Sequence, residues 1–196
     1  AFYGCIELAN ITIPYGVTHI HGTAFSNSGL TSVTIPDSVT YIGNRAFGDC
    51  KRLTHVIIPN SVTSIQSAFQ GCSKLVSAGP IGGGYSCEFG WSDEIPNSAF
   101  SNCNSLTDVI IPSGITYIGQ FAFAYCSNLT SVTIPSSVTS IGGWAFDNSR
   151  LTDVFYGGSK DEWMAVKIGE YNDSLLSATI HYTGSGESKS TQELFQ

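Results

Sequence analysis

The chain has 196 residues, of which 42% are hydrophobic and only 12% are charged. Its eight Lys and Arg residues are scattered and its formal net charge is −7, which disfavours a nucleic-acid partner because no basic stripe can form. No apolar run approaches the roughly 18 residues that a membrane-spanning helix needs, so we expect no membrane insertion by this segment.

A repeat of about 22 residues runs through most of the chain, in the range known for stacked repeat proteins. Each unit follows the pattern L-T-x-V-x-I-P-x-x-V-x-x-I-G-x-x-A-F-x-x-C. The opening leucines are Leu8, Leu30, Leu53, Leu75, Leu106, Leu129 and Leu151. One unit, residues 75–105, is longer than the others and departs from the pattern.

The unit that begins at Leu30 shows which segment forms which element. Alternating apolar residues after Leu30 predict a short strand, and Pro36 fits the end of that strand because it has no N–H to donate. A second extended segment follows, Gly43 permits a tight turn, and Ala46 and Phe47 are expected on a short helical turn on the convex side. We expect the following side chains, and their counterparts in other units, to be buried: Leu30, Val33, Ile35, Val39, Ile42, Ala46 and Phe47.

A single unit has too few apolar side chains to offset the entropy lost on ordering it, so the units must stack. The sequence therefore predicts a β-rich repeat solenoid of about seven coils, with short helical turns on the convex side.

This pattern resembles the BspA-like leucine-rich repeats of bacterial surface proteins. The likeness extends from residue 1 to about residue 182 and rests on the strand, the proline, the Ala-Phe pair and the cysteine recurring in register. The unit from Leu75 departs from the pattern, and those from Leu8 and Leu129 lack the cysteine. The resemblance implies a leucine-rich-repeat solenoid, display on the cell surface or secretion, adhesion and protein binding.

The predicted organisation has three parts. Residues 1–150 form the repeat array, which begins in mid-repeat because Ala1–Cys5 matches the A-F-x-x-C that closes a unit. We therefore expect apolar surface on the first coil, and self-association through Phe2, Ile11 and Ile13.

Residues 151–183 hold the last repeat and a C-terminal helix-strand cap. Ser159 and Glu162 have the spacing of a capping box at the start of the helix, and Thr179–Tyr182 has the pattern of a closing strand. Residues 184–196 are predicted to be a flexible polar tail or the remnant of a protease cleavage site.

Most of the cysteines share one position of the repeat: Cys5, Cys50, Cys72, Cys103 and Cys126. Two interpretations remain: a disulfide framework or metal site, or a buried column of free thiols. No C-x-x-C spacing occurs, and the shared register favours the column. His19 and His21 share a strand face, but no third ligand accompanies them, so we expect neither a metal site nor a cofactor. No nucleophile, phosphate-binding or metalloprotease motif occurs, and we expect no catalysis.

Two features are candidate binding surfaces. The first is the outward face of the main strands, where the residue type changes from unit to unit. Its candidate contact residues are His55, Ile57, Asp108, Ile110, Asp153 and Phe155. The apolar members are either exposed contacts or ordinary strand residues on a partly covered face. The second feature is the glycine-rich insert of the long unit, where Tyr85, Phe89 and Trp91 either bind a partner or pack inward to fill the gap.

The function predicted is a non-enzymatic module, extracellular or on the cell surface, that binds a protein or glycan on a host or neighbouring cell. A structural stalk without a specific ligand is the first alternative. A second is ice or surface binding by a threonine column: Thr40, Thr63, Thr116 and Thr139.

Overall fold

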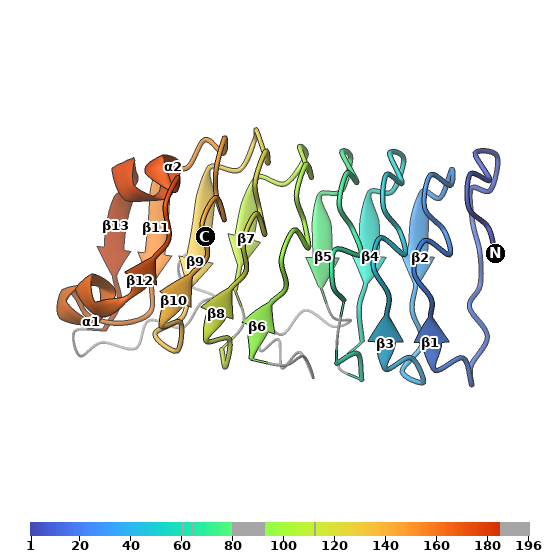
Figure 1. The fold of residues 1–196 in the computed structure, drawn as a ribbon, viewed down its shortest axis with the longest axis horizontal. Helices are drawn as coiled ribbons and strands as arrows, with labels where there is room; N and C mark the ends of the chain where they lie inside the picture. Colours follow the sequence, from blue (N-terminus) through green and yellow to red (C-terminus); the bar gives the residue numbers. More distant parts are fainter. Residues whose placement is uncertain (60, 64, 80–92, 112, 185–196) are drawn as a thin grey trace.

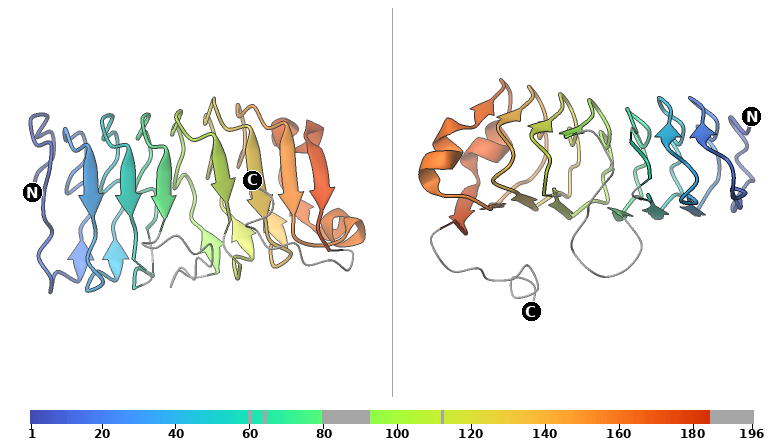
Figure 2. Two further views of the ribbon diagram at one scale, coloured as in Figure 1. Left: turned by 180° about the vertical axis from the view of Figure 1, so that it is seen from behind. Right: turned by 90° about the horizontal axis from the view of Figure 1, so that it is seen from below.

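The computed structural model describes residues 1–59, 61–63, 65–79, 93–111 and 113–184. In this part the chain winds into a parallel β-solenoid whose coils stack along one axis (Figures 1 and 2). Each regular coil carries a long strand on one side, a short strand on a second side and a series of tight turns on the third. The predicted β-rich repeat solenoid is confirmed.

The long strands form two parallel sheets, in the orders β2-β4-β5 and β7-β9-β11-β13. Their bounds are β2 (Ser32–Thr34), β4 (His55–Ile57), β5 (Ser77–Gly79), β7 (Asp108–Ile110), β9 (Ser131–Ile134), β11 (Asp153–Tyr156) and β13 (Thr179–Tyr182). An isolated bridge between Thr12 and Thr34 continues this side into the first coil. Alternation places Val33 in the core and Ser32 in solvent, so one face of each sheet closes the core and the other faces outward.

The short strands form a second side, in the orders β1-β3 and β12-β10-β8-β6. Their bounds are β1 (His19–Ile20), β3 (Tyr41–Ile42), β6 (Glu94–Ile95), β8 (Tyr117–Ile118), β10 (Ser140–Ile141) and β12 (Lys167–Ile168). Every side chain expected to be buried in the unit from Leu30 is at most 4% exposed, which confirms the predicted core.

The third side consists of successive tight turns and not of the expected short helical turns. Arg45 and Asp49 have φ of 52° and 56°, and residues in this left-handed region interrupt a right-handed helix. Backbone N–H groups alternate between two kinds of partner. The N–H of Gly48 donates within its own coil to Arg45 (2.9 Å), whereas that of Phe47 donates to Ala68 of the next coil (3.0 Å). The turns therefore form a third hydrogen-bonded side.

A column of phenylalanine rings runs through the core behind these turns. Neighbouring rings are nearly parallel, with centroids 5.2 Å apart between Phe25 and Phe47 and 5.4 Å apart between Phe47 and Phe69. The separation is largest, 6.0 Å, between Phe69 and Phe100, where the long unit follows the unit before it. The column is therefore wider at this joint but unbroken.

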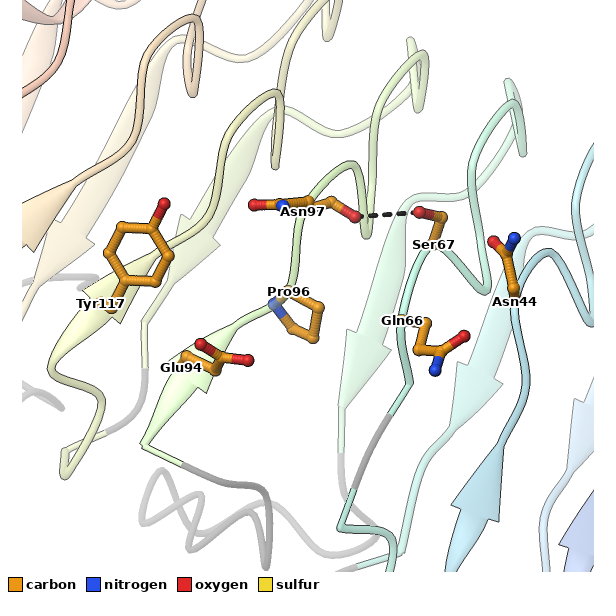
Figure 3. Close-up of a pocket in the computed structure, with 7 residues that line it drawn as sticks. All are labelled: Asn44, Gln66, Ser67, Glu94, Pro96, Asn97 and Tyr117. Atoms are coloured by element: carbon orange, nitrogen blue, oxygen red, sulfur yellow. Dashed lines mark hydrogen bonds between the residues drawn. The ribbon is translucent and has the colours of Figure 1, made fainter.

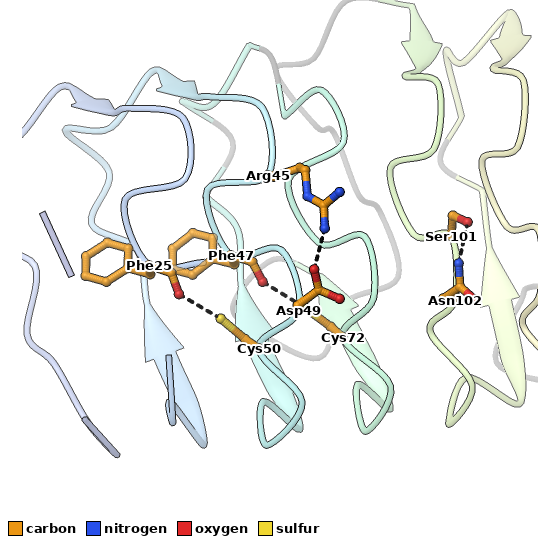
Figure 4. A network of polar contacts seen from close by, with 8 residues as sticks. All are labelled: Phe25, Arg45, Phe47, Asp49, Cys50, Cys72, Ser101 and Asn102. Atoms are coloured by element: carbon orange, nitrogen blue, oxygen red, sulfur yellow. Dashed lines mark hydrogen bonds and ion pairs between the residues drawn. The ribbon is translucent and has the colours of Figure 1, made fainter. Parts of the chain in front are cut away.

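The cysteines form a second column. Cys50, Cys72, Cys103 and Cys126 are fully buried, as predicted, and each thiol donates a hydrogen bond to a phenylalanine carbonyl of the preceding coil. Figure 4 shows the bond from Cys50 Sγ to the carbonyl of Phe25, at 3.1 Å. The described cysteines are free thiols. Their repeat position thus serves packing between coils.

Hydroxyl side chains also join the coils. Thr40 donates to the carbonyl of Thr18 at 3.3 Å, Thr63 to that of Thr40 at 3.0 Å, and Thr139 to that of Thr116 at 3.3 Å. The hydroxyls of the threonine column considered for ice binding therefore donate to backbone carbonyls of the neighbouring coil. This indicates a structural role for the column.

The C-terminal end is closed by two short helices, α1 (Lys160–Ala165) and α2 (Asp173–Ser177), and by β13 (Figure 1). The expected capping box is present: the Ser159 hydroxyl accepts from the Glu162 N–H, and the Glu162 carboxylate accepts from the Ser159 N–H. Trp163 of α1 is buried against the edge of Tyr156. The expected cap is thus present, with α2 as an element that the sequence did not indicate.

At the other end, the first coil exposes several large apolar side chains. Phe2 is 39% exposed, Tyr3 65% and Ile6 66%. Phe2 is thus exposed, as expected, whereas Ile13 is buried at 8% exposure because it packs into the core, and Ile11 is partly buried. Among the described residues, no helix is both long and apolar enough to cross a membrane.

Candidate binding face

The candidate face is the outward surface of the long strands. Parallel pairing aligns its residues in rows across the coils: Asp108, Ser131 and Asp153 form one row, and Ile110, Thr133 and Phe155 form another. Four of the six candidate strand residues therefore lie on one sheet, within three adjacent strands.

His55 and Ile57 lie on the other long-strand sheet. His55 is aligned with Ser32 of β2 and Ser77 of β5, and β5 and β7 belong to different sheets. The structure therefore separates this pair from the other four. His55 is exposed, and its Nδ1 lies 3.0 Å from the hydroxyl of Thr54.

The apolar members of the face are less exposed than expected for exposed contact residues, the first of the two interpretations. Ile57, Ile110 and Phe155 are all partly buried. Phe155 lies between Thr133 and His181 of the flanking strands, and the His181 ring stacks on it. Their partial burial favours the interpretation of ordinary strand residues on a partly covered face.

The end of the face nearest the cap carries a polar and aromatic cluster. His181 Nε2 lies 2.7 Å from the Asp153 carboxylate, and the His181 ring stacks on Phe155 with centroids 4.8 Å apart. The hydrogen bond from His181, followed by one from Thr152, lowers the pKa of Asp153. An imidazole, a carboxylate and an aromatic ring thus meet on one exposed surface, which we call the Asp153 cluster.

His181 was not among the residues predicted for this face. The signal was present, because β13 continues the register of the repeat: Thr179 is opposite Asp153, and His181 is opposite Phe155. The closing strand therefore adds a further row position to the candidate face.

The next carboxylate along the face belongs to Asp108. It accepts hydrogen bonds from Thr107, at 2.8 Å, and from Ser131 of the neighbouring strand. Asp108 and Asp153 flank Ser131, so this half of the face is negatively charged at neutral pH. A partner group for this region would be a hydrogen-bond donor or a cation.

The remaining candidates lie outside the described residues: Tyr85, Phe89 and Trp91. Among the residues that the structure describes, no three His, Cys, Asp or Glu side chains gather in a way that could hold a metal ion. The His19 and His21 rings lie side by side with centroids 6.2 Å apart, and both are exposed.

Parallel long strands, inward-facing leucines and a short return strand define this chain as a leucine-rich-repeat solenoid, a fold that typically binds partners or serves as a scaffold. Its sequence matches the BspA type leucine rich repeat region, in six copies over residues 1–79 and 93–164. The chain belongs to this family.

Solved structures agree with this assignment. A leucine rich cell surface protein from Faecalibacterium prausnitzii is 30% identical, with a TM-score of 0.64, over 90% of this chain and 46% of that protein. The leucine rich repeat protein of T. pallidum is 27% identical, with a TM-score of 0.64, over 81% of this chain and 71% of that protein.

A leucine-rich repeat protein from Bacteroides ovatus is 27% identical, with a TM-score of 0.57, over 96% of this chain and 54% of that protein. The chain thus spans about half the length of the F. prausnitzii and B. ovatus proteins. A comparison with curated proteins finds no match to this chain.

Proposed function

We propose that this chain is a non-enzymatic recognition module, located outside the cell or on its surface, that binds a protein or glycan of a host or neighbouring cell through its long-strand face. The observation that carries the proposal is the contrast between columns. Core columns repeat one residue type, whereas the third position of the long strands varies: it is His55 on one sheet, and Asp108, Ser131 and Asp153 on the other, with the Asp153 cluster at one end. Specific recognition needs positions that differ between repeats, and the outward face supplies them.

The location outside the cell is supported by the family and by the F. prausnitzii relative, which is described as a cell surface protein. The half-buried Ile57, Ile110 and Phe155 suit a partner that covers polar and apolar surface together, as protein and glycan ligands do.

The test compares two triple variants on a glycan array and in a pull-down of cell-surface proteins. The first carries His55→Ser, Asp108→Ser and Asp153→Ser on the face. The control carries His21→Ser, Asp37→Ser and Asp147→Ser, which lie off the long strands. Each of these surface changes typically alters stability by less than about 0.5 kcal/mol, so both variants should stay folded.

We expect the face variant to lose most binding and the control to keep it. Equal binding by both variants would assign recognition to another surface. Absence of binding by the parent chain to any glycan or surface protein would favour the structural stalk instead.

A further inference from the structure

The widened joint between Phe69 and Phe100 has a second consequence, on the short-strand side of the solenoid. Among the described residues, no strand pairing joins the sheet β1-β3 to the sheet that begins at β6, and a recess of about 410 Å³ opens between them. A recess of this size is in the range that small-molecule sites occupy, roughly 300–1,000 Å³.

The recess is lined by polar side chains from successive coils. Asn44, Gln66 and Asn97 contribute carboxamides, Glu94 contributes a carboxylate, and Tyr117 contributes a phenol at one end (Figure 3). Carboxamides both donate and accept hydrogen bonds, and a carboxylate accepts them. The lining can therefore pair with groups that are themselves donor and acceptor.

Part of this lining is fixed in place. Asn97 Oδ1 accepts from the N–H of Gln120 at 2.8 Å. The Asn97 carbonyl accepts from the Ser67 hydroxyl at 2.9 Å (Figure 3). These bonds hold Asn97 in place. Within the described part of the chain, the side chains of Asn44, Gln66, Glu94 and Tyr117 make no hydrogen bond to another residue.

The composition of the lining selects among ligand classes. Among the described lining residues none is cationic, and Glu94 is anionic, so a phosphate or carboxylate ligand would meet repulsion without a counter-charge. Among the lining residues that the structure describes, apolar surface comes from Pro96 and the Tyr117 ring, which is too little for a lipid or a largely apolar ligand. A neutral ligand rich in hydroxyl groups satisfies the amides and the carboxylate, and its C–H face can lie on an aromatic ring.

We infer that this recess binds a neutral saccharide unit, free or at the end of a glycan, through hydrogen bonds from its hydroxyls to Asn44, Gln66, Glu94 and Asn97 and through contact with Tyr117. The recess lies on the short-strand side, so this inference does not depend on the long-strand face being a recognition surface.

In the experiment, the full chain is titrated with D-glucose, D-galactose, D-mannose and N-acetyl-D-glucosamine. Saturation-transfer NMR and calorimetry measure the binding. D-glucuronate serves as the anionic counterpart of D-glucose. We expect saturable binding of at least one neutral sugar and none of D-glucuronate. Asn44→Ala and Glu94→Ala should each weaken binding by about tenfold, as expected for a lost hydrogen bond in a ligand site.

Two control variants make the test specific. Glu170→Ala removes an exposed carboxylate elsewhere on the short-strand side and should leave the affinity unchanged. The His55→Ser, Asp108→Ser, Asp153→Ser variant should also keep sugar binding, which separates this site from the long-strand face. Thermal melts by circular dichroism confirm that each variant is folded.

Three results would overturn the inference. They are no binding of any neutral sugar at millimolar concentration, binding that survives both Asn44→Ala and Glu94→Ala in folded protein, and tighter binding of D-glucuronate than of D-glucose.

Discussion

The side-chain oxygen of Asn172 accepts a hydrogen bond from the backbone N–H of Phe146, at 3.0 Å. In an earlier coil the equivalent N–H, that of Phe123, donates instead to the backbone carbonyl of Ala145, at 2.8 Å. Asn172 is 1% exposed, and its amide nitrogen donates to the carbonyl of Gly142 at 2.9 Å. The Asn172 side chain thus takes the place of the backbone carbonyl that a further coil would offer to Phe146. It ends the column of hydrogen bonds that joins the turns of successive coils.

Asn172→Ala should destabilise the chain markedly. The change leaves the buried Phe146 N–H without a partner, which costs about 1–3 kcal/mol. It also leaves the Gly142 carbonyl with only the long bond from the Ala145 N–H, at 3.4 Å. We expect the free energy of unfolding, measured in urea, to fall by about 2–4 kcal/mol. Asn10→Ala, at an exposed position, is the control. A similar small loss in both variants would contradict the role of Asn172.

The buried thiols should be protected from reagents in the folded chain. Cys50, Cys72, Cys103 and Cys126 are buried, whereas Cys5 is exposed. With Cys87, which lies outside the described residues, replaced by serine, a thiol-specific reagent should modify Cys5 rapidly and the four others only in denaturant. Failure to recover the four thiols in denaturant without reductant would instead indicate disulfides.

Alkaline pH should destabilise the fold through the same column. Burial raises the pKa of Cys126 from 9.0 to about 12, and it raises those of Cys72 and Cys103 well above the ordinary value. Between pH 9 and 12 the unfolded chain loses thiol protons that the folded chain retains. The stability from each thiol is therefore complete below pH 9 and declines as pH rises, by about 1.4 kcal/mol at pH 10.

The measurement compares urea unfolding at pH 7 and pH 10. Cys126→Ser should show a smaller loss of stability between the two values than the parent chain, because serine does not ionise in this range. Cys5→Ser, at an exposed position, should show the same loss as the parent. An unchanged loss in Cys126→Ser would show that this thiol does not contribute to the alkaline instability.

His181→Ala should raise the pKa of Asp153 towards its ordinary value. The hydrogen bond from His181 is the largest cause of the lowered pKa, and the one from Thr152 is the next. Because the folded pKa is depressed, ionisation of Asp153 stabilises the fold above the unfolded pKa, and this contribution disappears as pH falls. Carboxyl ¹³C NMR titration measures the shift. His55→Ala, on the other sheet, should not alter the pKa of Asp153. An unchanged Asp153 pKa in His181→Ala would contradict the hydrogen bond between His181 and Asp153.

The first coil should promote association between chains at high concentration. Phe2, Tyr3 and Ile6 expose apolar surface next to one another in sequence, and such surface favours contact with a second molecule. Sedimentation velocity should show a concentration-dependent increase in mass. Phe2→Ser with Ile6→Ser should reduce it, and the same behaviour in parent and variant would exclude this surface.

The core and the register could be predicted from the sequence because each repeat position faces the same environment in every coil. Leu30, Ile42 and Phe47 recur in register, and a solenoid buries all members of a column alike. The turns were not predicted, although one repeat position carried a signal: Asp49 and its counterparts Asn27, Asn102 and Asn148 all have positive φ, and Asp and Asn adopt this region more readily than most residues. Arg45 carries no such preference.

The candidate face was predicted less completely than the core. The row of Asp108 and Asp153 follows from strand alternation, but the partial burial of Phe155 depends on His181 of β13. Strand alternation predicts on which face a side chain lies. It does not predict which side chain of the next strand packs against it. The recess near Glu94 likewise depends on how far an insert separates two coils, which residue spacing alone does not give.

The column of phenylalanine rings has a consequence for how this array tolerates change in length. At the joint with the long unit the ring separation grows only from 5.4 to 6.0 Å, and the rings remain within 5° of parallel. The aromatic column thus continues through this joint, and the coils on either side of it stay aligned. Insertions at such a joint can create new pockets on the outside without altering the alignment of the coils on either side.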